Sequence, residues 1–195
     1  MLLSSGAAVG AQTSTISNGH SGVWFGFGLD AANSDISCTG CTFTGANDPW
    51  RGGLGTGVQI SVGGTVSPQM LIGAELGGGV VMAGNGDRSA SVVHLMAVAQ
   101  YYPDAYGGFF VRGGIGPAGI ELSDNGTSAK ASGFAAQAGV GYDFHLGKRV
   151  ALAPYANVGR LAVQQSSLRL SGNTGPVSQL DAKTYWHIGL SVNWY

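Results

Sequence analysis

The chain has 195 residues, of which 35 are glycine and only 10 % are charged, whereas globular proteins average ~7 % glycine and ~25 % charged residues. This composition fits neither a disordered chain nor an ordinary soluble domain. The formal net charge of -1 excludes a polybasic surface, so no nucleic-acid partner is expected. The sequence has no run of roughly 18 apolar residues, which excludes a transmembrane helix. Such a chain can span a membrane only as a closed β-barrel.

Residues 1–11 end in the small-residue pattern Val9-Gly10-Ala11, which is typical of a signal-peptidase site. The segment has a short apolar part and no basic residue before it. We interpret it as the remnant of a secretory signal, with a flexible N-terminal extension as the alternative. The remaining length suits one domain, and we place a single barrel domain at residues 20–195.

Alternation of apolar residues with polar residues or glycine predicts eight β-strands, because successive side chains of a strand point to opposite faces. The strands are expected at 22–30, 53–66, 70–82, 89–102, 108–122, 131–145, 150–163 and 186–194. Short connections follow the second, third, fourth and sixth strands, whereas longer loops follow the first, fifth and seventh, at 31–50, 123–130 and 166–180. Pro117 predicts a bulge or irregularity in the fifth strand, because proline cannot donate a ladder hydrogen bond.

The last strand carries the clearest two-face pattern. One face is apolar and has tryptophan at both ends: Trp186, Ile188, Leu190, Val192 and Trp194. The other face consists of His187, Gly189, Ser191 and Asn193. The distance from Trp186 to Trp194 is about 26 Å along a strand, or about 20 Å of height at a tilt of ~40°. This height is close to the lipid-facing band of an outer-membrane barrel, with an aromatic residue at each interface.

Charged residues avoid the apolar faces of the predicted strands. Glu75, Arg112 and Asp143 have the opposite, inward phase, and the other charged residues are expected in turns, loops or strand ends. Four aromatic residues are expected in the interface girdle: Tyr101, Tyr142, Trp186 and Trp194. Tyr102 is a further girdle candidate, whereas the phase of Trp24 favours the lumen.

These features resemble the small outer-membrane β-barrels of the OmpA/OmpX type over residues 22–195. The resemblance implies an all-β, eight-stranded antiparallel up-and-down transmembrane barrel, integral to the bacterial outer membrane with both termini in the periplasm. The implied partners are outer-membrane lipids, including lipopolysaccharide, and the barrel assembly machinery, which would read the strand 186–195. Such chains usually end on an outward-facing aromatic residue. Here Trp194 has that phase and Tyr195 adds one residue.

An eight-stranded barrel is wide enough inside only for its own side chains, so we expect a filled polar lumen instead of a wide pore. The expected lining is Glu75, His94, Gln100, Arg112, Gln137, Asp143, Tyr155, Asn157 and His187. Glu75 and Arg112 form the most natural ion pair, because unpaired buried charges are costly. A gated conduit or proton path is the alternative to a sealing plug.

The only two cysteines, Cys38 and Cys41, lie in the expected loop 31–50. A redox motif of this spacing would need a helix N-terminus, and a metal site would need about four ligands. We predict a local disulfide formed in an oxidising compartment, with two free thiols and then a metal site as alternatives. No cofactor is expected.

Three function classes fit this sequence. The leading hypothesis is a non-enzymatic outer-membrane barrel that contributes to envelope structure and displays loops to an unknown extracellular partner. The second is a soluble lipocalin-like ligand carrier, whose apolar faces would point inward. The third is an outer-membrane lipid-modifying enzyme or protease, but His187 and Ser191 lie ~13 Å apart along one strand, too far for a base and its nucleophile. Arg160 and Arg169 are candidates for binding lipopolysaccharide phosphates, with simple solvation as the alternative.

Overall fold

The computed structural model describes residues 21–39, 53–83, 88–124, 127–170, 173–176 and 179–195. Eight long strands form a wall: β1 (Val23–Thr39), β2 (Gly55–Ser67), β3 (Met70–Ala83), β4 (Arg88–Tyr101), β5 (Phe109–Asp124), β6 (Thr127–Tyr142), β8 (Val150–Leu170) and β10 (Gln179–Trp194). Two short strands, β7 (Phe144–His145) and β9 (Asn173–Pro176), each pair with β8. Among the described residues, no helix has the length and apolarity needed to cross a membrane.

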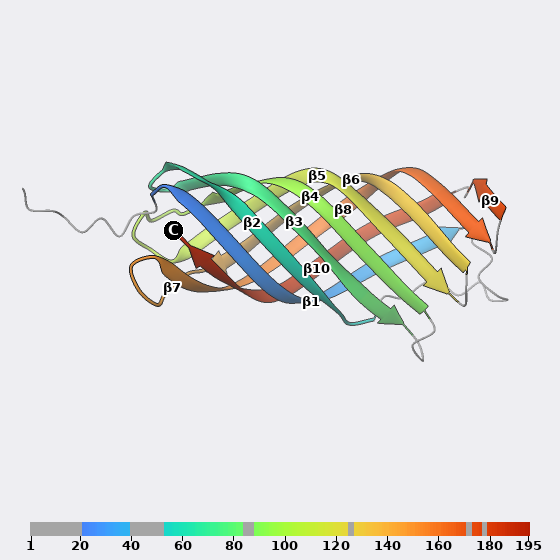
Figure 1. Ribbon diagram of the computed structural model, residues 1–195, viewed down its shortest axis with the longest axis horizontal. Coiled ribbons are helices and arrows are strands. Elements are labelled where there is room, and N and C mark those ends of the chain that lie inside the picture. The colour runs from blue at the N-terminus through green and yellow to red at the C-terminus, as the bar shows by residue number, and fades with distance from the viewer. Residues whose placement is uncertain (1–20, 40–52, 84–87, 125–126, 171–172, 177–178) are drawn as a thin grey trace, which may run out of the picture.

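The eight long strands close into an antiparallel barrel. Each pairs with the next along the chain, and β10 completes the circle by pairing with both β8 and β1. The closing register runs from Phe25 opposite Trp194 to Thr39 opposite Gln179. Figure 1 shows the resulting elongated barrel with strongly tilted strands. The predicted eight-stranded up-and-down barrel is therefore confirmed.

The two ends of the barrel differ in how the strands are joined. At one end Pro68 and Gln69 connect β2 to β3, and Tyr195 follows β10; we call this the turn end. At the other end β1 reaches Thr39 and β10 begins at Gln179; we call this the loop end. Both ends can be followed in Figure 1, where the turn end is on the left.

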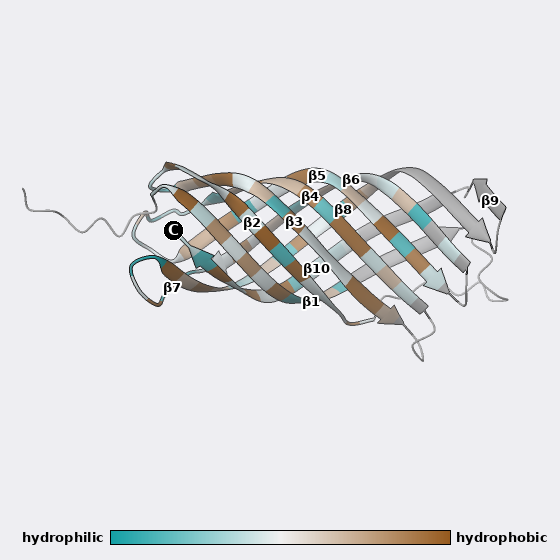
Figure 2. Ribbon diagram, viewed as in Figure 1, coloured by the Kyte–Doolittle hydropathy of each residue, from teal (hydrophilic) through white to brown (hydrophobic). Residues whose placement is uncertain are grey.

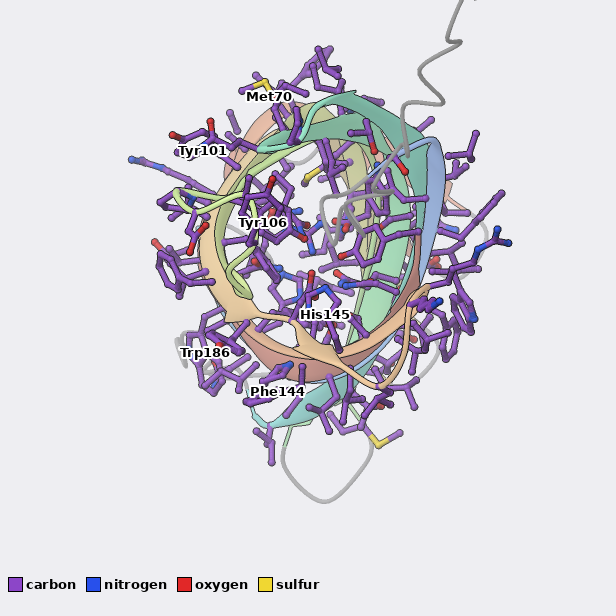
Figure 3. The ribbon with its side chains drawn as sticks, turned by 90° about the vertical axis from the view of Figure 1, so that its left-hand side faces the viewer. Met70, Tyr101, Tyr106, Phe144, His145 and Trp186 are labelled. Atoms are coloured by element: carbon purple, nitrogen blue, oxygen red, sulfur yellow. The ribbon has the colours of Figure 1, made fainter. Side chains whose placement is uncertain are left out.

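An apolar band surrounds the half of the barrel near the turn end. Outward side chains are apolar over 93–101 on β4, 134–142 on β6 and 186–194 on β10. Each stretch gives about 20 Å of height, close to the lipid-facing band of a membrane barrel. Figure 2 shows the brown bands crossing neighbouring strands, and Figure 3, seen from the turn end, shows Tyr101 and Trp186 outside the ring.

Beyond this band, toward the loop end, β3 keeps exposed apolar residues at Val80 and Met82, but the outward side chains of other strands become polar. They include Ser91, Glu121, Lys130, Ser132, Arg160 and Thr184. Glu121 and Lys130 face each other across β5 and β6, with 2.9 Å between Oε1 and Nζ. The 21 residues of β8 give roughly 50 Å of height, about twice a lipid band of ~25 Å. The barrel wall therefore continues well past its apolar band.

This extension corrects three sequence-based predictions. The loops predicted at 31–50 and 166–180 are shorter, because β1 and β8 continue into them and β10 begins within the second. The loop predicted at 123–130 is wrong, since only residues 125–126 separate β5 from β6. Described outward residues of these segments, such as Ser123 and Lys130, are polar, and a polar outward face reads as a loop in the sequence.

Pro117 interrupts the ladder between β4 and β5. Its ring is exposed on the outer face. The β4–β5 register runs through His94 opposite Ala118 and is next found at Ala97 opposite Ile115. The gap between these pairs agrees with the loss of the donor that proline lacks.

Candidate functional site: the filled lumen

A buried carboxylate, Asp143, organises the turn end of the lumen. It accepts hydrogen bonds from the Tyr102 hydroxyl (2.6 Å), the Tyr195 hydroxyl (2.5 Å) and the Asn193 amide (3.1 Å). The Gln100 amide donates to the Tyr102 hydroxyl. Tyr102, Asp143 and Tyr195 directly follow β4, β6 and β10, so this cluster ties three strand ends together across the mouth of the barrel.

Both tyrosines of this cluster act as neutral donors. Burial is the main cause that raises the pKa of the Tyr102 and Tyr195 phenols above their usual ~10, and the adjacent Asp143 carboxylate raises both further. An ionised phenol would place a second negative charge beside Asp143. Both phenols therefore stay protonated, and able to donate, at physiological pH.

Glu75 is the centre of the second layer and is completely buried. It forms a short ion pair with the Arg112 guanidinium and accepts hydrogen bonds from the Gln137 amide (2.7 Å) and the Ser61 hydroxyl (3.1 Å). His94 Nε2 lies 3.5 Å from Glu75 Oε1. Four side chains from four other strands thus surround the Glu75 carboxylate, which is how a low-dielectric interior accommodates an ionised carboxylate.

Asp30 holds the third layer. Its carboxylate accepts a hydrogen bond from the Tyr155 hydroxyl (2.9 Å) and lies 3.6 Å from His187 Nδ1. The His187 ring makes T-shaped contacts with two further rings, with centroid distances of 5.1 Å to Tyr185 and 6.4 Å to His94. The second and third layers are continuous through the two histidines. We use the name polar belt for seven residues of these two layers taken together: Asp30, Glu75, His94, Arg112, Gln137, Tyr155 and His187.

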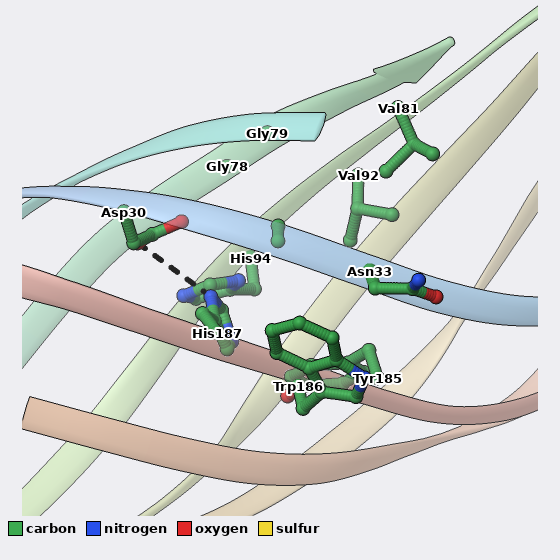
Figure 4. A pocket seen from close by; sticks show the side chains of 11 residues that line it. Asp30, Asn33, Gly78, Gly79, Val81, Val92, His94, Tyr185, Trp186 and His187 are labelled. Atoms are coloured by element: carbon green, nitrogen blue, oxygen red, sulfur yellow. Dashed lines mark ion pairs between the residues drawn. The ribbon is translucent and has the colours of Figure 1, made fainter. Parts of the chain in front are cut away.

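A small cavity lies where the polar belt ends. Its volume of about 30 Å³ gives room for about two water molecules. Asp30, His94 and His187 bound it on one side, and Val81 and Val92 bound it on the other (Figure 4). Asp30 Oδ1 and His187 Nε2 have no hydrogen-bond partner among the described residues. Water in this cavity can form hydrogen bonds with these two atoms.

On the loop-end side of the cavity, the inward side chains form an apolar cluster that we call the loop-end core. Its buried members are Val81, Ala90, Ala118, Ile120, Leu122, Ala131, Ala135 and Leu161. They come from β3, β4, β5, β6 and β8. In this part of the barrel the buried inward side chains are apolar, whereas polar side chains such as Glu121 and Lys130 lie outside.

The nine residues predicted to line the lumen all have inward-facing side chains in the structure. Four of them meet in the Glu75 cluster: Glu75, His94, Arg112 and Gln137. Tyr155 and His187 contact Asp30 instead, and Gln100 and Asp143 belong to the turn-end cluster. Asn157 stands apart, because its amide has no hydrogen-bond partner among the described residues.

Sequence reasoning missed Asp30, Ser61 and Tyr195 as members of this network, and it misassigned Tyr102. The prediction of Tyr102 as a girdle residue is wrong, because its side chain is fully buried in the lumen. It directly follows outward-facing Tyr101, so the alternation itself was the available signal. Asp30 had an inward phase, but its strand was expected to end there. Tyr195 carried no signal, since it follows the last predicted strand.

The predicted girdle residues Tyr101, Tyr142, Trp186 and Trp194 all lie on the outer surface. Trp186 is at the end of the apolar band that faces the loop end, and the other three are near the turn end. Trp24 is buried in the lumen, 4 % exposed.

Several predictions fall outside the described part of the structure. The signal remnant at 1–11, Cys41 and the side chains of Cys38 and Arg169 are among the residues that it does not describe. In the part of the chain that it does describe, no three His, Cys, Asp or Glu side chains are grouped to hold a metal ion. Ser191 donates to the Ala153 carbonyl (3.4 Å), so the observed partner of its hydroxyl is not a histidine.

No protein-family model and no curated protein matches this sequence. Neisserial surface protein A has a similar structure, with a TM-score of 0.61 and 11 % identity over 89 % of this chain and 97 % of that one. The outer membrane protein OprG from Pseudomonas aeruginosa matches with a TM-score of 0.50 and 16 % identity over 91 % and 99 % of the two chains. At these identities the likeness concerns the fold alone. That fold is the small eight-stranded outer-membrane β-barrel, as the OmpA/OmpX-type resemblance implied.

Proposed function

We propose that this protein is an integral, non-enzymatic outer-membrane barrel with a sealed lumen, which carries a water-exposed barrel extension and its loops at the cell surface. The observation that supports this most is the combination of an apolar outer band with a lumen blocked by buried side chains at three successive levels. A band of this height matches the hydrocarbon layer. The turn end is then periplasmic, as short turns at that end are typical of such barrels.

The network inside the barrel supports a structural role over a transport role. Each carboxylate in the lumen is held by two or more side chains, and these cross the lumen from several strands. A solute would have to break the Asp143 cluster and the Glu75 cluster in turn. Breaking a buried ion pair costs about 3–5 kcal/mol, so the closed lumen is the stable state.

This membrane placement indicates which part of the protein would contact each partner. The loop-end parts of β1, β8 and β10 and the short strand β9 would stand at the cell surface, available for adhesion or for recognition of an extracellular partner. The apolar band would contact outer-membrane lipids, including lipopolysaccharide. The strand 186–195 carries the aromatic pattern that the barrel assembly machinery would read.

Reconstitution into planar bilayers tests the sealed lumen. The refolded protein should migrate differently on a gel with and without boiling, and its bilayers should show no stepwise conductance. The double variant Glu75→Ala/Arg112→Ala removes the central obstruction without leaving an unpaired charge, and conductance steps should appear once the Asp143 and Asp30 layers are removed as well. Steps in the unmodified protein would contradict the sealed lumen, and recovery of folded protein in water without detergent would contradict the membrane placement.

A further inference from the structure

The outer surface carries a shallow groove across β5, β6, β8 and β10, with a volume of about 610 Å³. Two small outward residues, Ala138 and Ala156, form its floor. Larger side chains border it, among them Val111 on β5 and Trp186 and Ile188 on β10. The groove lies within the apolar band, so an apolar chain is the chemistry that fits it.

Among the described side chains, one cation lies directly above this groove, toward the loop end. Arg160 is the next outward residue after Val158 on β8, and it is paired in register with Ala136 on β6 and Thr184 on β10. Its side chain is exposed and flanked by these small neighbours. Among the described residues it has no ion-pair partner, unlike Lys130, which is paired with Glu121.

The position of Arg160 relative to the membrane sets the kind of ligand it can reach. Successive outward residues of one strand are ~6.6 Å apart, so Arg160 lies just beyond the row of Trp186 and Val158, where the band ends. Aromatic residues mark the headgroup level of a membrane. An arginine at that level faces lipid phosphates, which it binds through paired charge-assisted hydrogen bonds.

We propose that this groove and Arg160 together form a binding site for one phosphorylated lipid of the outer leaflet, with an acyl chain along Ala138 and Ala156 and a headgroup phosphate on the guanidinium. The site rests on the proposed membrane placement and specifies its lipid partner. In the outer leaflet of such a membrane the ligand is lipid A, a phosphorylated and acylated sugar.

Native mass spectrometry of the folded barrel in detergent tests this site, with diphosphorylated lipid A as the probe. Arg160→Gln should weaken lipid A binding about fivefold, the effect of one basic residue at a membrane surface. Ala156→Leu fills the groove and should weaken binding as well. Ala74→Leu, an outward alanine on the distant strand β3, and Lys130→Gln are the matched controls and should leave binding unchanged.

A second arm separates the phosphate from the acyl chain. Dephosphorylated lipid A should bind the unmodified protein as weakly as lipid A binds Arg160→Gln, and it should not distinguish the two proteins. Equal lipid A binding by Arg160→Gln and the unmodified protein would overturn the site, as would equal losses in the control variants. The boiled and unboiled gel migration of every variant is read in parallel, so a failure of barrel folding is distinguished from a failure of the lipid site.

Discussion

The apolar band and the loop-end section of the barrel are built from the same strands but have opposite sidedness. On β5, Ile115 points outward and Arg112 points inward within the band. A few residues further along the same strand, Glu121 points outward and Leu122 points inward. Nothing in the backbone changes between the two, because the ladder to β6 is continuous from Phe109 to Asp124.

The difference teaches that the surrounding solvent determines which face of each strand is apolar. Where lipid surrounds the wall, the interior has to hold the polar groups, and each must find a partner there. Where water surrounds the wall, the interior becomes an ordinary hydrophobic core. The lipocalin-like arrangement, considered from sequence for the whole chain, describes the loop-end section alone.

The largest expected effect comes from removing one charge of the polar belt. Arg112→Leu leaves Glu75 buried and ionised without its main partner, which costs about 3–5 kcal/mol. Urea titration of the refolded protein in lipid vesicles should show this fall in the free energy of unfolding. The double variant Glu75→Leu/Arg112→Leu should recover most of it. A double variant as unstable as the single one would mean that unpaired charge is not the cause.

The loop-end core should respond as a soluble core does. Leu122→Ala should lower the free energy of unfolding by about 2–5 kcal/mol, because it leaves a cavity among buried side chains. The adjacent Glu121→Ala should change it by less than about 1 kcal/mol, since its ion pair is exposed to water. Similar costs at the two positions, measured by the same titration, would remove the distinction between inside and outside in this section.

The turn-end cluster offers a smaller test. Tyr195→Phe removes one hydrogen bond to the buried Asp143 carboxylate, and bonds to charged groups contribute about 1.5–3 kcal/mol. Tyr101→Phe is the matched control, because the Tyr101 hydroxyl lies on the outer surface and should matter little. Equal stabilities for the two variants would contradict the role of Tyr195 in closing the turn end.

Much of this architecture could be predicted because period-two alternation is a local property. The phase of Gln100 or Asn157 within its strand was enough to place the residue on the inner face. The partners were harder, because a tilted barrel brings together residues from strands that are not neighbours. Asp30 and Tyr155 are 125 positions apart in the sequence, and no local pattern pairs them.

Strand ends at the loop end were also beyond local reasoning. A polar outward residue such as Ser123 or Lys130 reads as a loop when lipid is assumed outside every strand. The inward residue Ala131, which follows this segment, is small and gives a weak signal. The change of solvent along the barrel axis had to be known before the alternation could be read correctly.

The most direct measurement compares an outward arginine at two depths of one strand. Ile115→Arg lies in the middle of the apolar band, where arginine costs about 2–4 kcal/mol, and Ser123→Arg lies beyond it, where the cost should be about 0–1 kcal/mol. Urea unfolding of both variants in lipid vesicles gives the two values directly. A large cost at Ile115 with a negligible one at Ser123 is the predicted result. Equal costs at the two depths would contradict the reversal of sidedness where the bilayer ends.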